Sequence, residues 1–480
     1  SFEGQYRRFE GGANAQQYIP IDPATNQAIP VNRKDTLLPG NISEFRQNRT
    51  YVALDHQFNA DWSLSWKIMH NDADNPYYRN NLAAGGSTFP LGPGQTFLYV
   101  FEGQNRQKTD ATMLDVTGHF TTPGVKHTLL LGADYYNKRF TQLSGADFSQ
   151  ATDYLNPDLP APVAQTDTWS LRNREYSWYV QDQMALPGNW HLLLGGRQQS
   201  IHERNVSDMP SMFSAPQDVT YKKTVFLPRF GLLWQPIPSL STYYSYAENM
   251  GSSNGLEASG APIKPEWSKQ HEVGVKSEWL NRRLLANFAV FNLTKFNVAS
   301  ADLANPGFNI GVGEVRSTGY ELNIQGALTS AWNILANYSH ARPHVITGAS
   351  GAAALQPQTI VAGQNLPFVS NDTFALWTSY RLPGEALAGW TIGGGANWAS
   401  APNPVDGATI KPKSYTVASA FASYETRLLG KMATLQLNVN NLFDKKYLLY
   451  QSDDVSVGGN TLAGSWGTPR QIRMNLRVAF

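Results

Sequence analysis

The side chains that could perform chemistry are scattered along this sequence. Its 9 histidines form no HExxH motif, and the closest pair, His340 and His344, lies four residues apart in HARPH. On a helix that spacing converges on a metal ion, but on a strand or loop it does not, so we interpret it as a chance pair. The absence of cysteine excludes disulfides, thiolate zinc sites, iron–sulfur clusters and cysteine catalysis. We therefore expect no catalytic residues, no metal site and no enzyme.

Neighbouring carboxylates are the other candidates for chemistry. Asp72 and Asp74 lie in HNDADN, and Asp453 and Asp454 are adjacent. Such carboxylates could bind Ca²⁺, but in polar segments they are more often solvated loop charges, which is the interpretation that we favour. Arg79 in NPYYRNN is expected to be a solvated loop charge as well.

The composition excludes several classes of protein. Of 480 residues, only 16% are charged and 12% are aromatic, while the mean hydropathy is −0.36. A typical soluble domain has roughly 25% charged residues. The net charge of +1 gives no footprint for nucleic acid, and the most apolar stretch, Leu284 to Leu293, is too short for a transmembrane helix. Such a chain needs a fold that spreads apolar residues thinly over much surface.

Strict alternation of apolar and polar residues recurs along the chain. At the C-terminus Ile472, Met474, Leu476, Val478 and Phe480 alternate with Gln471, Arg473, Asn475 and Arg477. A period of two is typical of strands whose two faces meet different surroundings. We predict about eighteen strands, near residues 1–10, 43–58, 61–70, 110–121, 126–140, 172–186, 189–203, 220–236, 239–250, 266–280, 282–298, 313–328, 331–343, 367–382, 389–400, 413–428, 432–444 and 469–480.

Short and long connections alternate between the predicted strands. Short ones such as Asn59-Ala60 are followed by long ones such as 71–109, 141–171 and 204–219. A transmembrane barrel has this rhythm, with short periplasmic turns and long extracellular loops, and its sheet closes because every backbone amide in lipid must be paired. We therefore predict an all-β fold, a transmembrane antiparallel β-barrel of the outer membrane. A soluble propeller or solenoid is disfavoured because we find no fixed repeat of roughly 20–50 residues.

Several segments resemble the β-barrel of TonB-dependent ferric-siderophore receptors. The strongest are LQLNVNNLFDKKY (Leu435 to Tyr447) and GTPRQIRMNLRVAF (Gly467 to Phe480). That family typically carries an NLFD-K-Y stretch before its last strand and ends in an aromatic residue. Within the family, the chain is most similar to ferrichrome-type hydroxamate receptors, especially at HEVGVK and FNLTKFN.

The resemblance implies a barrel of about 22 strands, plugged by an N-terminal globular domain. About 18 of the 22 strands are present, so residues 1–480 are expected to be one barrel domain that begins near the fifth strand. The N-terminal plug domain, the signal peptide and the box that engages TonB are expected to be absent from the chain. An even number of strands puts Ser1 and Phe480 on the same, periplasmic, side.

The resemblance also implies a function and a set of partners. The protein would be a TonB-dependent transporter that imports a ferric siderophore, of the hydroxamate type, across the outer membrane of a Gram-negative bacterium. Its partners would be the ferric siderophore, TonB through the missing N-terminal region, outer-membrane lipid and lipopolysaccharide, and the barrel-assembly machinery, for which Phe480 would be the terminal signal. We expect no nucleic acid and no cofactor, because iron would be carried only inside its chelator. Two alternatives stay open: a passive porin-like channel, and a TonB-dependent receptor for another ligand such as cobalamin.

Aromatic residues of the long loops are the candidate ligand contacts. A ferric hydroxamate complex is compact, and aromatic side chains supply contact area and hydroxyl donors at low entropic cost. By resemblance, the family places ligand-contacting tyrosines near Tyr77 and Tyr78, and the following loop contacts ligand in similar receptors. The alternative for each residue is packing in a loop or an aromatic girdle. The candidates are Tyr77, Tyr78, Phe97, Tyr99, Phe101, Phe148 and Tyr154.

Overall fold

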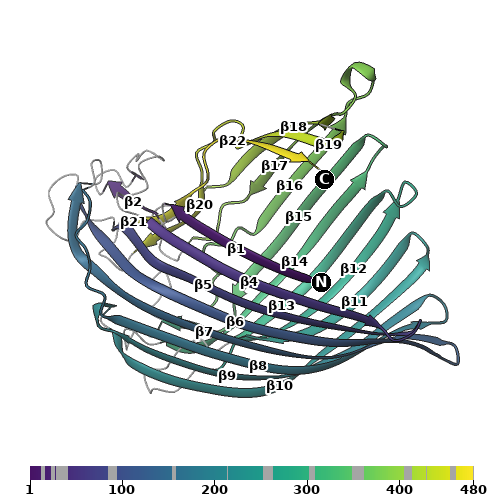
Figure 1. The fold of residues 1–480 in the computed structure, drawn as a ribbon, viewed down its shortest axis with the longest axis horizontal. Helices are drawn as coiled ribbons and strands as arrows, with labels where there is room; N and C mark the ends of the chain where they lie inside the picture. The colour runs from purple at the N-terminus through teal and green to yellow at the C-terminus, as the bar shows by residue number, and fades with distance from the viewer. Residues whose placement is uncertain are drawn as a thin grey trace.

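The chain forms one large curved β-sheet and a small second sheet (Figure 1). The large sheet has 18 strands, which confirms the predicted number. Among the described residues, no helix is long and apolar enough to cross a membrane. The computed structural model describes residues 1–11, 17–22, 27–28, 42–84, 95–153, 158–212, 214–251, 263–301, 309–348, 362–404, 413–428, 430–454 and 461–478.

The strands of the large sheet follow one another in the chain, and the small sheet is built from the first and last long loops. The large sheet contains β1 (Phe2–Gly11), β4 (Ile42–Gln57), β5 (Trp62–Ala84), β6 (Gln95–Thr122), β7 (Val125–Asp153), β8 (Asp167–Leu186), β9 (Trp190–Met209), β10 (Ser214–Ile237), β11 (Leu240–Met250), β12 (Trp267–Trp279), β13 (Leu284–Ala301), β14 (Asn309–Ala327), β15 (Trp332–Val345), β16 (Asp372–Arg381), β17 (Trp390–Ala399), β18 (Tyr415–Leu428), β19 (Lys431–Asn440) and β22 (Gln471–Val478). The small sheet contains β2 (Gln17–Asp22), β3 (Gln27–Ala28), β20 (Leu448–Asp454) and β21 (Thr461–Trp466). Two 3-10 turns are η1 (Pro210–Met212) and η3 (Glu385–Leu387).

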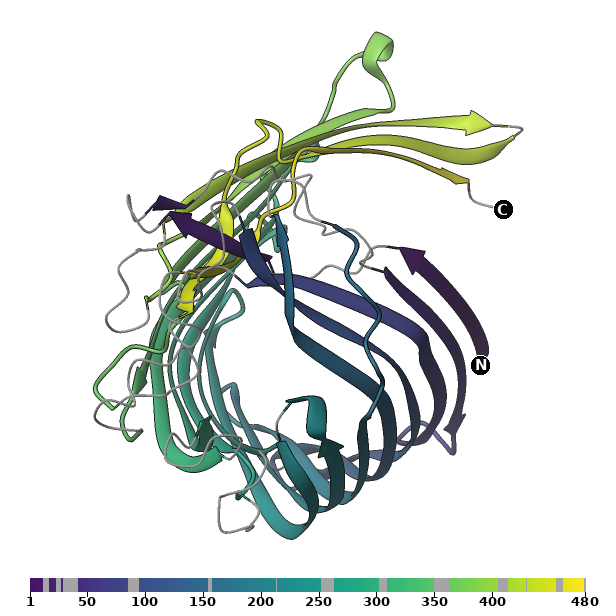
Figure 2. The same ribbon diagram turned by 90° about the vertical axis from the view of Figure 1, so that its left-hand side faces the viewer.

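Each strand of the large sheet pairs antiparallel with the next one along the chain. The pairing passes from β1 to β4, then through consecutive strands to β19, and from β19 to β22. Antiparallel neighbours joined by tight turns satisfy each other's backbone groups, as β6 and β7 do from Thr122↔Val125 to Gln95↔Asp153. Figure 2 shows that the large sheet, which we call the wall, curls round to form most of a barrel.

β1 and β22 are the two edges of the curled wall. The registers join β1 to β4 and β22 to β19, and in Figure 2 the strands beside the two chain ends stand apart. β1 begins and β22 ends at the short-turn end of the sheet, as the even strand number predicts. The small sheet connects the loops beside these edges, since β2 pairs with β21 from Gln17↔Gly464 to Pro20↔Thr461. Unpaired backbone groups cannot face lipid, so these edges need a strand beside them in a membrane.

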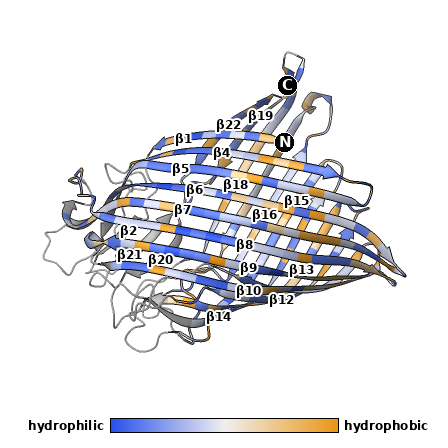
Figure 3. Cartoon of the chain, turned by 60° about the horizontal axis from the view of Figure 1, so that its bottom comes forward, coloured by the Kyte–Doolittle hydropathy of each residue, from blue (hydrophilic) through white to orange (hydrophobic). Residues whose placement is uncertain are grey.

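The alternation gives the wall an apolar and a polar face. Trp66, Leu114 and Trp178 lie in one cross-strand row and remain 43%, 41% and 57% exposed. The other face carries charged side chains such as Asp134 and Arg197. A membrane barrel turns its apolar face toward lipid, so the row of Trp66 is on the outer face and Asp134 faces the lumen. In Figure 3 the orange, apolar bands of the front strands gather toward the short turns.

Aromatic side chains collect close to the short turns. Trp190 and Trp234 stack with ring centroids 5.5 Å apart, beside the turn between β8 and β9. Trp390 and Tyr424 lie 5.0 Å apart near the turn between β16 and β17. Aromatic rings of this kind prefer the membrane–water interface, so these pairs mark the periplasmic level of the wall.

The strands extend beyond their predicted ends. The segments 71–109, 141–171 and 204–219 were expected to be loops, but most of their residues belong to β5–β10. Stretches such as EGQNRQK (102–108) are polar on both faces, so alternation disappears while the ladder of hydrogen bonds continues. As a result Tyr77 and Tyr78 lie inside β5 rather than at its end.

Candidate functional site

The predicted ligand-contacting residues lie at the long-loop end of β5 to β7. The strand assignments are β5 for Tyr77 and Tyr78, β6 for Phe97, Tyr99 and Phe101, and β7 for Phe148. The side chains of Phe97, Tyr99 and Phe148 lie outside the described part of the structure, as do Tyr154 and Phe480 entirely. The structure therefore brings three candidate strands together and shows the surroundings of Tyr77, Tyr78 and Phe101 only.

Tyr77 and Tyr78 lie on opposite faces of β5. A register shift between Asn75 and Tyr78 places Tyr78 opposite Gly103, where a Cβ atom would come within 2.8 Å of the tyrosine hydroxyl. Burial raises the pKa of Tyr78, and a hydrogen bond with Ser144 partly offsets it. Tyr77 is 36% exposed. Tyr78 is therefore held over the lumen-facing side of β6, whereas Tyr77 is on the outer face of β5, opposite Glu44 of β4.

Arg79 and Glu102 form a buried ion pair beside the tyrosines. They lie opposite each other in β5 and β6, and are 8% and 4% exposed. Arg79 Nη1 also donates to the carbonyl of Pro160 at 3.3 Å. Charges are rarely buried unless they are paired, so Arg79 is not the solvated loop charge that the sequence suggested. It ties the segment before β8 to the walls of β5 and β6.

Asp167 fastens a second loop to the same region. Its carboxylate, 2% exposed, accepts hydrogen bonds from the backbone N–H of Ser211 at 2.9 Å and from the Ser211 hydroxyl. The Ser211 hydroxyl oxygen accepts from the backbone N–H of Ala146 at 2.8 Å. The turn η1, between β9 and β10, is thereby bonded to β7 and β8. Together with the contacts of Arg79, these hydrogen bonds hold the segments around the long-loop ends of β5 to β8 in place. We call this end of the wall the mouth.

The lumen-facing side of the wall carries a connected set of charged groups. Arg197 makes two hydrogen bonds to Asp134, at 2.6 and 2.9 Å, and lies 5.6 Å from the ring centroid of Tyr179. The Tyr179 hydroxyl donates to Asp115 at 2.5 Å. These residues come from β6, β7, β8 and β9. A charged wall of this kind is typical of a wet or plugged barrel interior.

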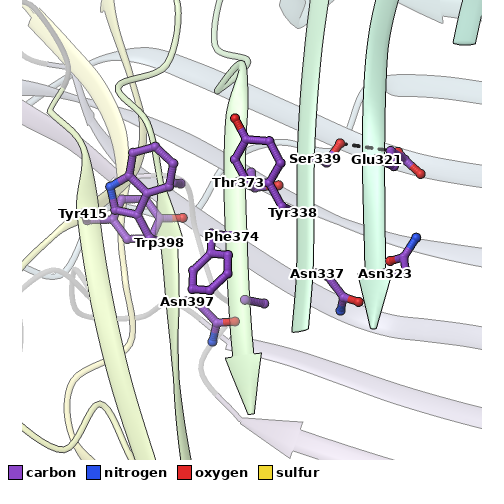
Figure 4. Close-up of a pocket in the computed structure, with 12 residues that line it drawn as sticks. Glu321, Asn323, Asn337, Tyr338, Ser339, Thr373, Phe374, Asn397, Trp398 and Tyr415 are labelled. Carbon is purple, nitrogen blue, oxygen red and sulfur yellow. Dashed lines mark hydrogen bonds between the residues drawn. The ribbon is translucent and has the colours of Figure 1, made fainter. Parts of the chain in front are cut away.

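A polar recess lies on the same side of the wall, between β14 and β18. Its volume is about 370 Å³, within the usual range for small-molecule pockets. Figure 4 shows three amides, Asn323, Asn337 and Asn397, and the hydrogen bond of 3.4 Å from Ser339 to Glu321. Of the aromatic residues at the recess, Tyr415 shares the face of the amides, whereas Tyr338, Phe374 and Trp398 form a cross-strand row whose side chains point to the other face. The recess offers hydrogen-bond donors and acceptors beside the ring of Tyr415, which suits a polar ligand or a packed loop.

The acidic and histidine motifs have ordinary partners in the structure. Asp72 lies in β5 and makes two hydrogen bonds with Arg106, at 2.9 and 2.6 Å, so its interpretation as a solvated loop charge is wrong. His340 Nδ1 lies 2.7 Å from Asp372 Oδ1. No group of three or more His, Asp or Glu side chains suited to a metal ion occurs within the described ranges. The buried groups that the sequence missed, Glu102 and Asp167, had no local signal, because their partners are distant in the chain: Arg79 in β5 and Ser211 in η1.

The NNLFDKK motif joins β19 to β22, the last two strands of the large sheet. Asn441 is 2% exposed; its amide donates to the carbonyls of Lys445 and Thr468, both at 2.9 Å, and accepts from the backbone N–H of Lys445 at 2.7 Å. Asp444 accepts from the backbone N–H of Arg470 at 2.9 Å. The motif therefore joins the end of β19 to the start of β22.

Comparison with known proteins agrees with this architecture. A family model described as "TonB dependent receptor-like, beta-barrel" matches residues 2–442. The ferric-pyoverdine 358 receptor of Pseudomonas putida is 28% identical over 456 residues, covering 89% of this chain and 51% of the relative. The ferrichrome outer membrane transporter/phage receptor of Escherichia coli (strain K12) is 24% identical over 474 residues, covering 91% and 60%. The chain thus spans about half to three-fifths of the length of these curated relatives.

A solved structure shows the same fold. The crystal structure of the siderophore receptor PiuA from Acinetobacter baumannii superposes with a TM-score of 0.81 at 20% identity, covering 99% of this chain and 71% of that one. Its low identity supports the fold alone. The eighteen-stranded antiparallel wall and the family match over residues 2–442 establish that this chain belongs to the TonB-dependent receptor family, as a β-barrel of the Gram-negative outer membrane.

Proposed function

We propose that this chain is the barrel wall of an outer-membrane receptor that imports a ferric siderophore with energy supplied through TonB. The family is one of receptors rather than enzymes, and the work is transport without bond making. Residues 1–480 would form one barrel domain, with a plug inside it in the whole protein. Phe480 would be its terminal assembly signal, and its deletion should lower the amount of protein inserted in the outer membrane.

The observation that carries this proposal is the contrast between the two sides of the wall. The outer face is apolar, whereas the lumen-facing side carries the network of Asp134, Arg197, Tyr179 and Asp115 and the recess of Figure 4. A plug needs a polar wall on which to pack and slide, and a bulky polar chelate needs donors along its route. The buried Arg79–Glu102 pair holds the mouth firm around such a ligand.

The ligand is proposed to be of the hydroxamate type. The resemblance at HEVGVK and FNLTKFN favours it, and relatives at 24% and 25% identity are named for ferrichrome and ferrioxamine. Others at 28% are named for ferric pyoverdine and for metal-pseudopaline, so the identities do not single out one chelator. Tyr77, Tyr78 and Phe101, together with Phe97, Tyr99, Phe148 and Tyr154, are the proposed ligand contacts.

Growth under iron limitation tests the ligand class. A strain that carries the whole receptor as its sole siderophore receptor is supplied in turn with ferrichrome, a ferric catecholate and a ferric pyoverdine. The proposal expects growth on ferrichrome at the lowest concentration. Growth on one of the others alone would keep the receptor and replace the ligand, and equal growth with an inactivated TonB would favour a passive channel.

A further inference from the structure

Two glutamates lie close together on the lumen-facing side of the wall, below the mouth. Glu203 of β9 is directly opposite Asn173 of β8, and Glu175 follows Asn173 on the same face of β8. Glu203 and Asn173 are each only 7% exposed. Thirteen residues along β9 separate Glu203 from Trp190, at the periplasmic level. At about 3.3 Å per residue and a tilt of about 45°, this is a rise of roughly 30 Å, so Glu203 lies at the outer limit of the hydrocarbon core.

The two carboxylates differ in their partners. Glu175 Oε1 accepts a hydrogen bond from Asn173 Nδ2, and Glu175 Oε2 accepts one from Gln199 Nε2, both at 3.1 Å. The Glu203 carboxylate has neither a hydrogen bond nor an ion pair in the part of the chain that the structure describes. Buried charges are rarely left without a partner. Glu203 therefore calls for a partner that the described chain does not supply.

Oxygen atoms beside the glutamates lack partners as well. The amide nitrogen of Asn173 is bonded to Glu175, which turns the amide oxygen away from that carboxylate. Asn173 Oδ1 is buried and has no hydrogen bond, and the same is true of Ser177 Oγ, which follows Glu175 on the same face of β8. Carboxylate, amide and hydroxyl oxygens are the ligands that Ca²⁺ takes in proteins. A surplus of buried acceptors beside an unpartnered carboxylate points to a bound cation.

The cations of the chain do not neutralise the pair. Lys138 of β7 lies opposite Asn173, and Lys223 of β10 lies one position further along the face, opposite Ile201. Neither lysine forms an ion pair within the described ranges. Burial, and then the like charge of Glu175, raise the pKa of Glu203, and the charge of Lys138 offsets this only in part. The site is therefore short of positive charge.

We propose that Glu203, Glu175 and Asn173 bind a divalent metal ion of the calcium kind, which joins β8 to β9 below the mouth. Ca²⁺ accepts irregular cages of oxygen ligands and completes its shell with water, whereas zinc sites are built mainly from nitrogen and sulfur. Two carboxylates balance the two charges of the ion, so their repulsion is replaced by a cross-link. The expectation of no metal site rested on local motifs, whereas these ligands meet through the register of two strands.

Binding of radioactive Ca²⁺ to the whole receptor in detergent tests the site. The receptor is first freed of metal with a chelator, and bound calcium is then counted by equilibrium dialysis. Glu203→Gln keeps the size of the side chain and removes its charge, so this site should bind Ca²⁺ at least about ten-fold more weakly. The matched control is Glu321→Gln, which neutralises a lumen-facing glutamate of β14. The wild type and E321Q should each bind one more ion per chain than E203Q, and equal numbers in all three would overturn the site.

Thermal melting gives a second, independent readout. In chelator, E203Q should melt higher than the wild type, because it removes an unpaired buried charge. In saturating Ca²⁺ the order should reverse, since only the wild type gains stability from the ion. Lys138→Met should tighten Ca²⁺ binding by removing a nearby positive charge. If Lys138 is instead the partner of Glu203, K138M will melt lower and bind Ca²⁺ no better, which would overturn the proposal.

A proton on Glu203 is the competing ligand, because the neutral acid can donate to Asn173 Oδ1. The other titratable groups that face the pair are Tyr136, Tyr221, Lys138 and Lys223, which ordinarily titrate above about pH 9. Since the pKa of Glu203 is raised, wild-type stability in chelator should fall as the pH rises from about 5 to 8, and saturating Ca²⁺ should remove this fall. The same fall with and without Ca²⁺ would overturn the metal ion in favour of the proton.

Discussion

The ion pair of Arg79 and Glu102 is the most deeply buried charge pair in the described part of the wall. Its partners are 8% and 4% exposed; Arg79 Nη2 contacts Glu102 Oε1, while the Arg79 Nε atom lacks a hydrogen bond. Desolvation of two such charges is costly, and their attraction repays it only while both are present. The pair therefore serves less as a source of stability than as a lock that fixes where the segment at Pro160 meets β5 and β6.

The first prediction concerns this lock. Arg79→Gln leaves Glu102 buried without a partner, which should cost about 3–5 kcal/mol and open the long-loop ends of β5 and β6. Hydrogen exchange of the whole receptor should show faster exchange in 79–84 and 95–102 only. The double variant R79M/E102L restores a neutral pair and should recover most of the protection. Unchanged exchange in R79Q would show that the pair does not hold this mouth.

The second prediction concerns the tyrosines. Tyr78→Ala should weaken binding of ferrichrome about ten-fold, because aromatic anchors carry much of a small interface. Tyr77→Ala should weaken it less, because Tyr77 is on the other face of β5. Tyr78→Phe keeps the ring over Gly103 and removes the hydroxyl, so it separates packing from hydrogen bonding. Tyr176→Ala, half-exposed on the outer face, is the matched control and should bind normally. Unaltered affinity in Y77A and Y78A would remove both residues from the ligand site.

At the scale of elements, the NNLFDKK motif fixes the position at which the chain enters the last strand, β22. Asn441 and Asp444 adopt φ values of 50° and 49°, a left-handed conformation that asparagine and aspartate tolerate better than most residues. Their side chains bond to residues 445, 468 and 470, so the chain returns from the loop to β22 at a fixed register. Phe443, by contrast, is 77% exposed and has no part in these bonds.

Asn441 and Phe443 lie in the same turn but differ in their contacts, so their replacement should have different effects on stability. Asn441→Ala removes three hydrogen bonds from a buried position and should destabilise the β19–β22 pairing by about 2–4 kcal/mol. Phe443→Ala, in the same turn, should have little effect. Urea unfolding of the whole receptor in detergent compares the two. Equal midpoints for N441A and F443A would assign the motif a role outside folding.

The strands were predictable from the sequence only where they cross the membrane, because there one face meets lipid and the residues alternate between apolar and polar. Runs such as Ile472 to Val478 alternate because one face meets lipid, and they predicted the strand number and the short–long rhythm of connections. Beyond the bilayer both faces of β5, β6 and β7 meet water, so the sequence 102–108 carries no period although it is strand. The contacts at the long-loop end were harder still to predict, because Glu102 finds its partner in another strand through the register and Asp167 finds its partner in the turn η1. Single-sequence patterns contain neither relation.

At the scale of the whole molecule, the wall divides three environments. Its outer face presents apolar rows to lipid, its lumen-facing side carries a polar recess and a charged network, and its long-loop end is fastened by the Arg79 and Asp167 contacts. Low charge and many aromatics in a chain of negative mean hydropathy follow from this division, because the sheet has no conventional core.

The central claim is that this wall belongs to an energy-coupled importer of a ferric siderophore. The most direct measurement is uptake of radioactive iron, supplied as ferrichrome, by cells that carry the whole receptor, with TonB active or inactivated. The account predicts saturable binding in both strains but accumulation of iron only where TonB is active. Accumulation at equal rates in both strains, rising linearly with ferrichrome concentration, would contradict it and show a passive channel.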